Sequence, residues 1–181
     1  MRIISGKNKG RKIVAPHNLP VRPTTDMAKE SLFNILNNLI DFDGLNVLDL
    51  FAGTGNISYE FASRGCSSIT SVDSNSHCTN FIKDTSAKLN FENLKVIRSD
   101  AKRFLDNAYE KWDIIFADPP YTMEETGFIP TITTNRKLLN PDGFLIIEHN
   151  EAKDFTEYDG FFDHRKYGKV NFSFFQNSEK K

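Results

Sequence analysis

Residues 47–55 decide the fold, and they read Val47-Leu48-Asp49-Leu50-Phe51-Ala52-Gly53-Thr54-Gly55. An apolar run that ends in an acidic residue and two closely spaced glycines is typical of a strand that leads into a binding loop. Gly-x-Gly alone is a weak signal, and the alternative is a buried strand closed by a glycine turn. The third glycine of a dinucleotide-binding loop would fall at Ser58, so a pyrophosphate is poorly supported.

Polar residues also follow three later strands that the sequence predicts. The run at 68–72 ends at Asp73, at about the twenty-residue offset expected of a carboxylate that binds a ribose. Residues 95–98 lead into Ser99-Asp100-Ala101, and residues 112–117 lead into Asp118-Pro119-Pro120-Tyr121. Four such strand ends predict a ligand site at one edge of a sheet.

From residue 43 onward the predicted strands and helices alternate, which indicates a mostly parallel, Rossmann-like α/β sheet with helices on both faces. The expected strands are 46–50, 68–72, 95–98, 112–117 and 144–148, and a C-terminal antiparallel hairpin at 161–167 and 170–175 makes a seven-stranded sheet. The expected helices are 25–38, 56–63, 76–89, 102–108 and 124–139, the last with an imperfection at Pro130. Asn140-Pro141-Asp142-Gly143 predicts a turn, and Phe172 and Phe174 are expected in the core.

Composition narrows the class of protein. The 181 residues, 39% of them hydrophobic, can bury one full core. The sequence contains neither an apolar run of membrane-spanning length nor a signal-peptide segment, so we expect a cytoplasmic protein. Cys66 and Cys78 lack a Cys-x-x-Cys spacing and are expected to be reduced thiols without a metal.

The charge is unevenly distributed along the chain. Residues 1–29 carry seven Lys/Arg and one acidic residue, a net +6, whereas the rest of the chain carries a net −7. Residues 2–5 and 11–14 are β-prone and flank Gly6-Lys7-Asn8-Lys9-Gly10, which predicts a hairpin with a cationic tip. The expected nucleic-acid contacts are Arg2, Lys7, Lys9, Arg11, Lys12 and Arg22. The alternative is a solvated basic tail.

A helix is expected to hold this hairpin beside the sheet. Ala28, Leu32, Ile35, Leu36 and Leu39 recur at spacings of three and four, which places them on one helix face. The organisation that follows is a basic appendage over 1–40 and a Rossmann-like domain over 41–181.

The expected catalytic residues are Asp118, Pro119, Pro120 and Tyr121. Two consecutive prolines remove two N–H donors, so the carbonyls and the Asp118 carboxylate form an acceptor-only cluster. Such a cluster suits an exocyclic amine, whose lone pair is otherwise delocalised into the ring. Tyr121 can stack on the face of a base. The alternative is a tight turn with an aromatic plug.

Five short motifs are spread over nearly the whole chain. They are Arg2-Ile3-Ile4-Ser5-Gly6 with Gly10-Arg11-Lys12, Arg22-Pro23-Thr24-Thr25-Asp26 with Glu30-Ser31-Leu32-Phe33-Asn34, the loop 49–55, Ser63-Arg64-Gly65, and Asp118-Pro119-Pro120-Tyr121. Together they make the chain resemble the RsmD family, the bacterial 16S ribosomal RNA guanine-N2 methyltransferases. The glycine loop and the Asp118 turn are shared by many amino-methyltransferases, whereas the two N-terminal motifs point to this family.

The resemblance implies a class I methyltransferase with S-adenosylmethionine as cofactor and 16S ribosomal RNA, or the assembling small ribosomal subunit, as partner. It implies cofactor contacts by Thr24, Thr25, Asp49, Phe51, Ala52, Gly53, Thr54, Gly55, Asp73, Ser74, Asp100, Ala101 and Asp118. In this interpretation Asp73 binds the ribose hydroxyls, Asp100 lies near the adenine, and Thr24 and Thr25 close over the cofactor. Met27 stands where the family more often has arginine, and Asp73 where it more often has glutamate.

Two other functions remain open. One is an amino-methyltransferase that acts on adenine in DNA or RNA, or on a protein glutamine, because the Asp118 turn suits planar amides and amines alike. The other is a catalytically idle RNA-binding module, against which the intact loop and turn both argue. The four histidines have no ligand spacing and are expected to be non-catalytic: His17, His77, His149 and His164. We expect a monomer.

Overall fold

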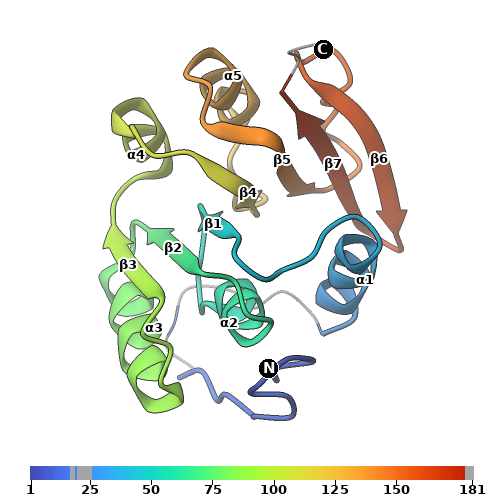
Figure 1. Cartoon of the computed structure of the whole chain (residues 1–181). Coiled ribbons are helices and arrows are strands. Elements are labelled where there is room, and N and C mark those ends of the chain that lie inside the picture. The colour runs from blue at the N-terminus through green and yellow to red at the C-terminus, as the bar shows by residue number, and fades with distance from the viewer. Residues whose placement is uncertain (17–18, 20–25, 178–181) are drawn as a thin grey trace.

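The computed structural model describes residues 1–16, 19 and 26–177. The predictions for Arg22, Thr24 and Thr25 therefore lie outside the described residues. The chain forms a seven-stranded sheet in the order β3-β2-β1-β4-β5-β7-β6 (Figure 1). The strands are β1 (Asn46–Asp49), β2 (Ser68–Asp73), β3 (Leu94–Arg98), β4 (Trp112–Ala117), β5 (Leu139–His149), β6 (Phe161–Tyr167) and β7 (Val170–Gln176).

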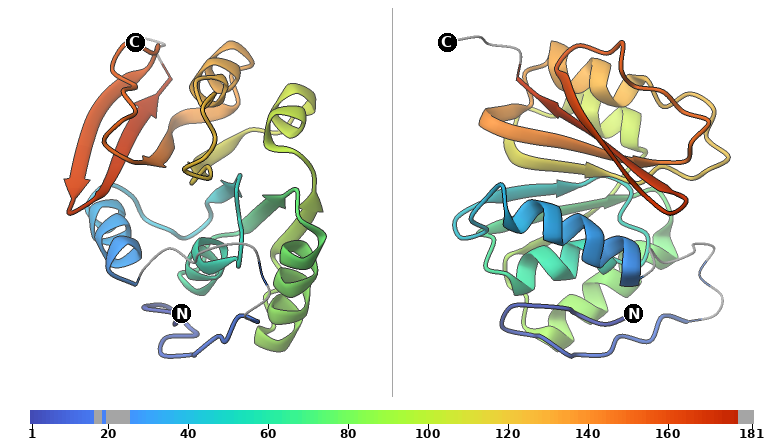
Figure 2. Two further views of the ribbon diagram at one scale, coloured as in Figure 1. Left: turned by 180° about the vertical axis from the view of Figure 1, so that it is seen from behind. Right: turned by 90° about the vertical axis from the view of Figure 1, so that its right-hand side faces the viewer.

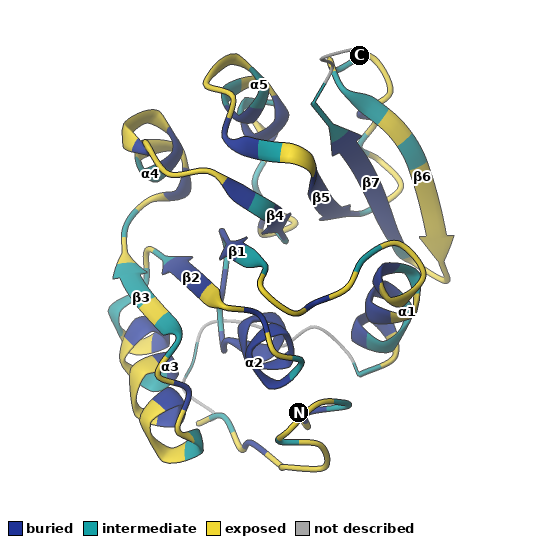
Figure 3. Cartoon of the chain, viewed as in Figure 1, coloured by how far each residue is buried: buried dark blue, intermediate teal, exposed yellow. Residues whose placement is uncertain are grey.

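Strands β1 to β5 are parallel, and β7 and then β6 add to β5 in antiparallel fashion. Figure 2 shows this C-terminal hairpin at one side of the sheet. Strand β7 is buried between its neighbours and β6 is mostly exposed, as an edge strand should be (Figure 3). The predicted fold class is confirmed, and Phe172 and Phe174 are core residues.

The helices cover both faces of the sheet (Figures 1 and 2). They are α1 (Asp26–Asn37), α2 (Asn56–Ser63), α3 (Ser76–Leu89), α4 (Ala101–Asn107) and α5 (Phe128–Asn135). Because side chains alternate along a strand, Val47 of β1 packs toward α1, α2 and α3, whereas Leu48 packs toward α4 and α5. Among the described residues no helix is long and apolar enough to cross a membrane.

Helix starts follow the local sequence. Asn75 caps α3 by accepting from the backbone N–H groups of His77 and Cys78, and Asp100 caps α4 by accepting from that of Arg103. Asn75 lies two residues after Asp73 at the end of β2, and Asp100 lies two residues after the end of β3 at Arg98. The chain thus turns from strand to helix at the edge where a ligand would bind.

Three predicted elements differ from the structure. The helix expected at 124–139 is only Phe128–Asn135, because Pro130 has no N–H donor and is tolerated only in the first helical turn. The turn expected at 140–143 is a bulge inside β5, where Asp142 has φ 61° and the pairing with β4 shifts between Trp112 and Ile114. The helix pattern of α1 was also partly wrong, since Leu39 lies beyond the helix and is 50% exposed while Phe33 is buried.

The N-terminal hairpin (residues 1–13) is a looser structure than the two strands predicted. It has one antiparallel bridge, between Arg2 and Lys12. Backbone hydrogen bonds continue as far as Ile3, whose carbonyl accepts from the Gly10 N–H at 2.9 Å. Beyond Ile3 the N–H groups of Ile4 and Ser5 donate instead to the Glu60 carboxylate of α2, at 2.8 and 3.0 Å. Ile3 is buried in the same core cluster as α1 and α2, so the hairpin and the Rossmann-like fold share one core.

Candidate active site

Four acidic residues lie at the C-terminal ends of adjacent parallel strands. Asp49 ends β1, Asp73 ends β2, Asp118 follows β4, and Glu148 is the penultimate residue of β5. The chain order reverses between β1 and β4, which is where open α/β sheets bind their ligands. The first three were predicted, whereas Glu148 was not.

The glycine loop is held in shape by Asp73. One carboxylate oxygen accepts from the Gly53 N–H at 2.8 Å and the other accepts from the Asn75 N–H at 2.8 Å. Burial raises the pKa of Asp73, and these two backbone donors oppose the rise. Gly55 has φ 78°, and a Cβ there would lie 2.6 Å from Cζ of Tyr59. The loop therefore requires glycine at this position.

Asp49 is only 1% exposed, and its carboxylate is hydrogen-bonded inside the fold. Its carboxylate accepts from Ser58 Oγ at 2.5 Å, and Ser58 in turn accepts from Ser71 Oγ at 2.7 Å. Burial raises the pKa of Asp49 to about 7, the Ser58 hydrogen bond opposes this, and the Asp118 and Asp73 carboxylates add to it. Ser58, which replaces the third glycine of a dinucleotide loop, thus anchors the acidic residue of this loop.

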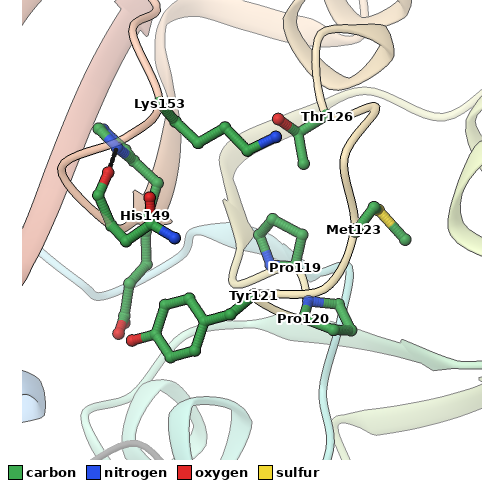
Figure 4. A pocket seen from close by; sticks show the side chains of 9 residues that line it. Pro119, Pro120, Tyr121, Met123, Thr126, His149 and Lys153 are labelled. Atoms are coloured by element: carbon green, nitrogen blue, oxygen red, sulfur yellow. Dashed lines mark hydrogen bonds between the residues drawn. The ribbon is translucent and has the colours of Figure 1, made fainter.

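The Asp118 turn opens onto a small cavity (Figure 4). Pro119 is buried, whereas Tyr121 is 62% exposed and lies beside the prolines with its ring at the cavity. One expected acceptor is already used inside the turn, because the Pro120 carbonyl accepts from the Met123 N–H at 2.8 Å. The Pro120 carbonyl therefore contributes to the shape of the turn.

Glu148 lines the same cavity, and sequence reasoning missed it. It is 4% exposed, and its Oε2 atom has no hydrogen-bond partner within the described part of the chain. Burial, and after it the Asp118 carboxylate, raise the pKa of Glu148 to about 9. The signal that could have found it is the one used for Asp118, a polar residue at the end of an apolar parallel strand.

His149 also lines the cavity, but its ring is engaged in the fold. Nε2 lies 2.8 Å from Ser173 Oγ and Nδ1 lies 2.8 Å from the Asn150 carbonyl oxygen. Burial lowers its pKa. That the histidines are non-catalytic stays a prediction.

The other predicted cofactor residues, in the glycine loop and after β2 and β3, differ in how far they are buried. Phe51 is half-buried, Ala52 and Ala101 are buried, and Ser74 and Asp100 are exposed. Thr54 is buried, and its hydroxyl donates to Sδ of Met1 at 3.4 Å. This contact joins the cofactor loop to the N-terminal hairpin.

The cationic residues of the hairpin are exposed, as predicted. Arg2 pairs with Asp26 at 3.6 Å and Glu30 at 3.2 Å on α1, so its charge is partly neutralised. The Lys7 ammonium lies 5.5 Å from the centroid of the Phe91 ring.

The acidic groups at this edge of the sheet suit a positively charged ligand. Asp118 raises the pKa of both Asp49 and Glu148, so acidic groups lie close together at the strand ends, and a positively charged partner would stabilise those that are ionised. S-adenosylmethionine carries a sulfonium and an ammonium group. Within residues 1–16, 19 and 26–177, no three His, Cys, Asp or Glu residues are grouped as metal ligands.

Comparison with known proteins gives consistent matches over nearly the whole chain. A family described as conserved hypothetical protein 95 matches residues 1–176. A putative rRNA methyltransferase of Bacillus subtilis, YlbH, is 36% identical over 87% of this chain and 86% of its own length. Ribosomal RNA small subunit methyltransferase D of Buchnera aphidicola from Acyrthosiphon pisum is 33% identical over 83% of this chain and 78% of its own.

A solved structure extends the agreement to the fold. The putative methyltransferase yhhF from Escherichia coli superimposes with a TM-score of 0.85 at 26% identity, covering 99% of both chains. The glycine loop, the acidic strand ends and the N-terminal motifs thus occur together in a chain that matches these relatives from end to end. The chain belongs to the conserved hypothetical protein 95 family, the RsmD family that its motifs predicted.

Proposed function

We propose that this protein uses S-adenosylmethionine to methylate the exocyclic N2 amine of a guanine in small-subunit ribosomal RNA. The observation that carries the proposal is the position of the Asp118 turn, which lies at the same sheet edge as the glycine loop in a chain of this family. Ribosomal RNA as substrate is supported by the names of the relatives. Guanine N2 as the acceptor rests on the resemblance and on the chemistry of the turn.

The loop residues would hold the cofactor. When bound, S-adenosylmethionine supplies an electrophilic methyl group on its sulfonium. Gly53 and Gly55 let the backbone approach the ligand closely. One Asp73 oxygen accepts from the Gly53 N–H and the other from the Asn75 N–H, and each carboxylate oxygen has a second lone pair that can accept from a ligand hydroxyl group. The crowded carboxylates at the strand ends stabilise the positive charge.

The turn would hold the amine. The Asp118 carboxylate accepts from an amine hydrogen, which draws electron density onto the nitrogen and orients its lone pair away from the turn. Tyr121, exposed beside the prolines, offers a ring face for the base to stack on. Bases of RNA loops are already unstacked, so the small surface of this chain suits a loop better than a duplex.

The N-terminal hairpin would bind the RNA backbone. Its exposed cations belong to a segment whose first residue, Met1, contacts Thr54 of the glycine loop, and cations of this kind bind phosphates. We expect a partly assembled small subunit to be a better substrate than free RNA, because its proteins hold an RNA loop open.

The test is to incubate the purified protein with cofactor carrying a labelled methyl group and with unmodified small-subunit ribosomal RNA, free or partly assembled. Nucleoside mass spectrometry should find the label in N2-methylguanine. Label only in N6-methyladenine or in protein would overturn the substrate and leave the methyltransferase assignment standing. The absence of any transfer would favour an idle RNA-binding module.

A further inference from the structure

Glu148 is a buried acid near the end of β5, with 4% of its surface exposed. Its Oε2 atom has no hydrogen-bond partner within the described residues, although a buried polar atom usually has one. Its side chain lines the cavity to which Pro119, Pro120 and Tyr121 also contribute. Leaving a buried polar atom without a hydrogen bond destabilises the fold, so its presence beside the Asp118 turn calls for a partner that arrives with the substrate.

Two features of its position favour the neutral acid. The side chain is removed from water, and the nearest charge that acts on it is the Asp118 carboxylate, which carries the same sign when both are ionised. Both effects raise its pKa, to about 9. A carboxylic acid kept neutral in an apolar site is a known way for a protein to donate a hydrogen bond at neutral pH.

The Watson–Crick edge of guanine matches a neutral carboxyl on one side and an acceptor on the other. O6 accepts and N1–H donates, so one carboxylic acid group can donate its O–H to O6 while its carbonyl oxygen accepts from N1–H. The N2 amine lies next to N1 and remains free for a second acceptor. We propose that Glu148 is the residue that selects guanine, binding its O6/N1 edge as a neutral acid while Asp118 holds the N2 amine; this rests on the proposed function.

Adenine would be positioned wrongly by the same pair. Its N1 accepts and its N6 amine donates, so a neutral Glu148 could bind that edge only by taking the amine itself. The amine would then lie against Glu148 and away from Asp118. Selection of guanine thus follows from which of the two acids receives the amine.

The cavity must widen for a base to enter. Its volume is about 10 Å³, roughly the space of one water molecule. Tyr121 lies at this cavity and is 62% exposed, so a rotation of its side chain can admit the base and then cover its face (Figure 4). The amide and carboxyl forms of residue 148 have the same size, which allows a clean comparison.

The experiment compares Glu148→Gln with Glu148→Leu in the full-length protein, using unmodified small-subunit ribosomal RNA partly assembled with its proteins. Gln keeps one donor and one acceptor, so kcat/KM should stay within about threefold of wild type. Leu keeps the bulk and loses both hydrogen bonds, so kcat/KM should fall about 10- to 100-fold. Calorimetry should give the same affinity for S-adenosylmethionine in all three proteins, and thermal melting should show that the variants are folded.

A base analogue then tests contact with the edge itself. Once fragment mass spectrometry has located the methylated guanine, the RNA is rebuilt with 2-aminopurine there, which keeps the 2-amine and lacks O6 and N1–H. Replacing the guanine with 2-aminopurine should lower the wild-type rate by about the same factor as Glu148→Leu lowers the rate on guanine. The same replacement should lower the rate of Glu148→Leu little further. The proposal is overturned if Gln is as impaired as Leu, if Leu stays within about twofold of wild type, or if the two losses simply multiply. Wild type that yields no methylguanine at all would overturn the proposed function as well, and the two failures are therefore distinguishable.

Discussion

Two groups of ionisable side chains in this chain differ in whether oppositely charged or similarly charged groups lie next to each other. Between the N-terminal hairpin and helices α1 and α2, opposite charges meet: the Lys29 ammonium lies 3.5 Å from the Glu60 carboxylate, and both side chains are 0% exposed. Arg64 donates to the same carboxylate at 3.0 Å. At the C-terminal edge of the sheet like charges meet, and Asp118 raises the pKa of Asp49 and of Glu148. The first arrangement stabilises the fold, and the second is typical of a binding site.

The comparison predicts the largest stability loss at Glu60. Glu60→Ala removes the partner of a buried ammonium and of two backbone N–H groups of the hairpin, at Ile4 and Ser5. Leaving that charge unpaired should lower the free energy of unfolding by about 3–5 kcal/mol, as measured by urea denaturation.

A matched control exists on the surface of the same hairpin. Glu30→Ala removes a pair between Arg2 and Glu30 whose side chains are 56% and 43% exposed, and it should cost less than about 1 kcal/mol. Equal losses for Glu30→Ala and Glu60→Ala would mean that the buried pair does not anchor the hairpin.

Asp118→Ala tests the acidic group at the strand ends and should leave the protein folded. Removing one preorganised polar group from the site of chemistry should slow methyl transfer by at least about 100-fold, because the amine loses its acceptor. Affinity for S-adenosylmethionine should stay within a few-fold, measured by titration calorimetry. A rate close to wild type in single-turnover assays would exclude Asp118 as the amine acceptor.

The two groups also differ in how far sequence could predict them. Asp49, Asp73 and Asp118 end apolar strands, a local pattern, and all three lie where the sequence placed them. The Lys29–Glu60 pair joins residues from separate helices across the core, and no local pattern indicates which acid meets which base. The bulge in β5 likewise depends on its pairing with β4, which a local pattern does not indicate. The late start of α5 follows instead from Pro130, a local feature that limits how far the helix extends before it.

Glu148 should make stability fall as pH rises. Its pKa is raised from 4.5 in the unfolded chain to about 9 in the fold, so between these values the folded state keeps a proton that the unfolded state releases. The stabilisation is fully present below about pH 4.5 and is lost as pH rises through about 9. Relative to Glu148→Gln, wild type should lose up to about 1.4 kcal/mol of unfolding free energy per pH unit in this window.

Urea denaturation of the two proteins across that window measures this difference. Tyr121, His149 and Lys153, titratable groups that line the same cavity, are present in both proteins. The Asp118 carboxylate is also present in both, and its interaction with Glu148 is part of the difference that is measured. Parallel curves would show that Glu148 is ionised in the folded state, in which case it would bind the N1–H of guanine as an anion and not the O6/N1 pair as an acid.

The smallest expected effect is a change in the salt dependence of RNA binding, which should differ between an exposed lysine of the hairpin and an arginine that already has acidic partners. Lys9 is exposed at the tip of the hairpin, whereas Arg2 already pairs with Asp26 and Glu30. If Lys9 contacts a phosphate, Lys9→Gln should flatten the log–log salt dependence of RNA binding by about 0.7–0.9, a roughly threefold change in affinity across a fourfold change in salt. Arg2→Gln should change the slope less, because its acidic partners already offset the charge that would release counterions.

Filter binding to unmodified small-subunit ribosomal RNA at several salt concentrations measures both slopes, and affinity for S-adenosylmethionine should not change in either variant. Equal slopes for wild type and Lys9→Gln would return the tip of the hairpin to a solvated surface and leave Arg11 and Lys12 as the cations to examine.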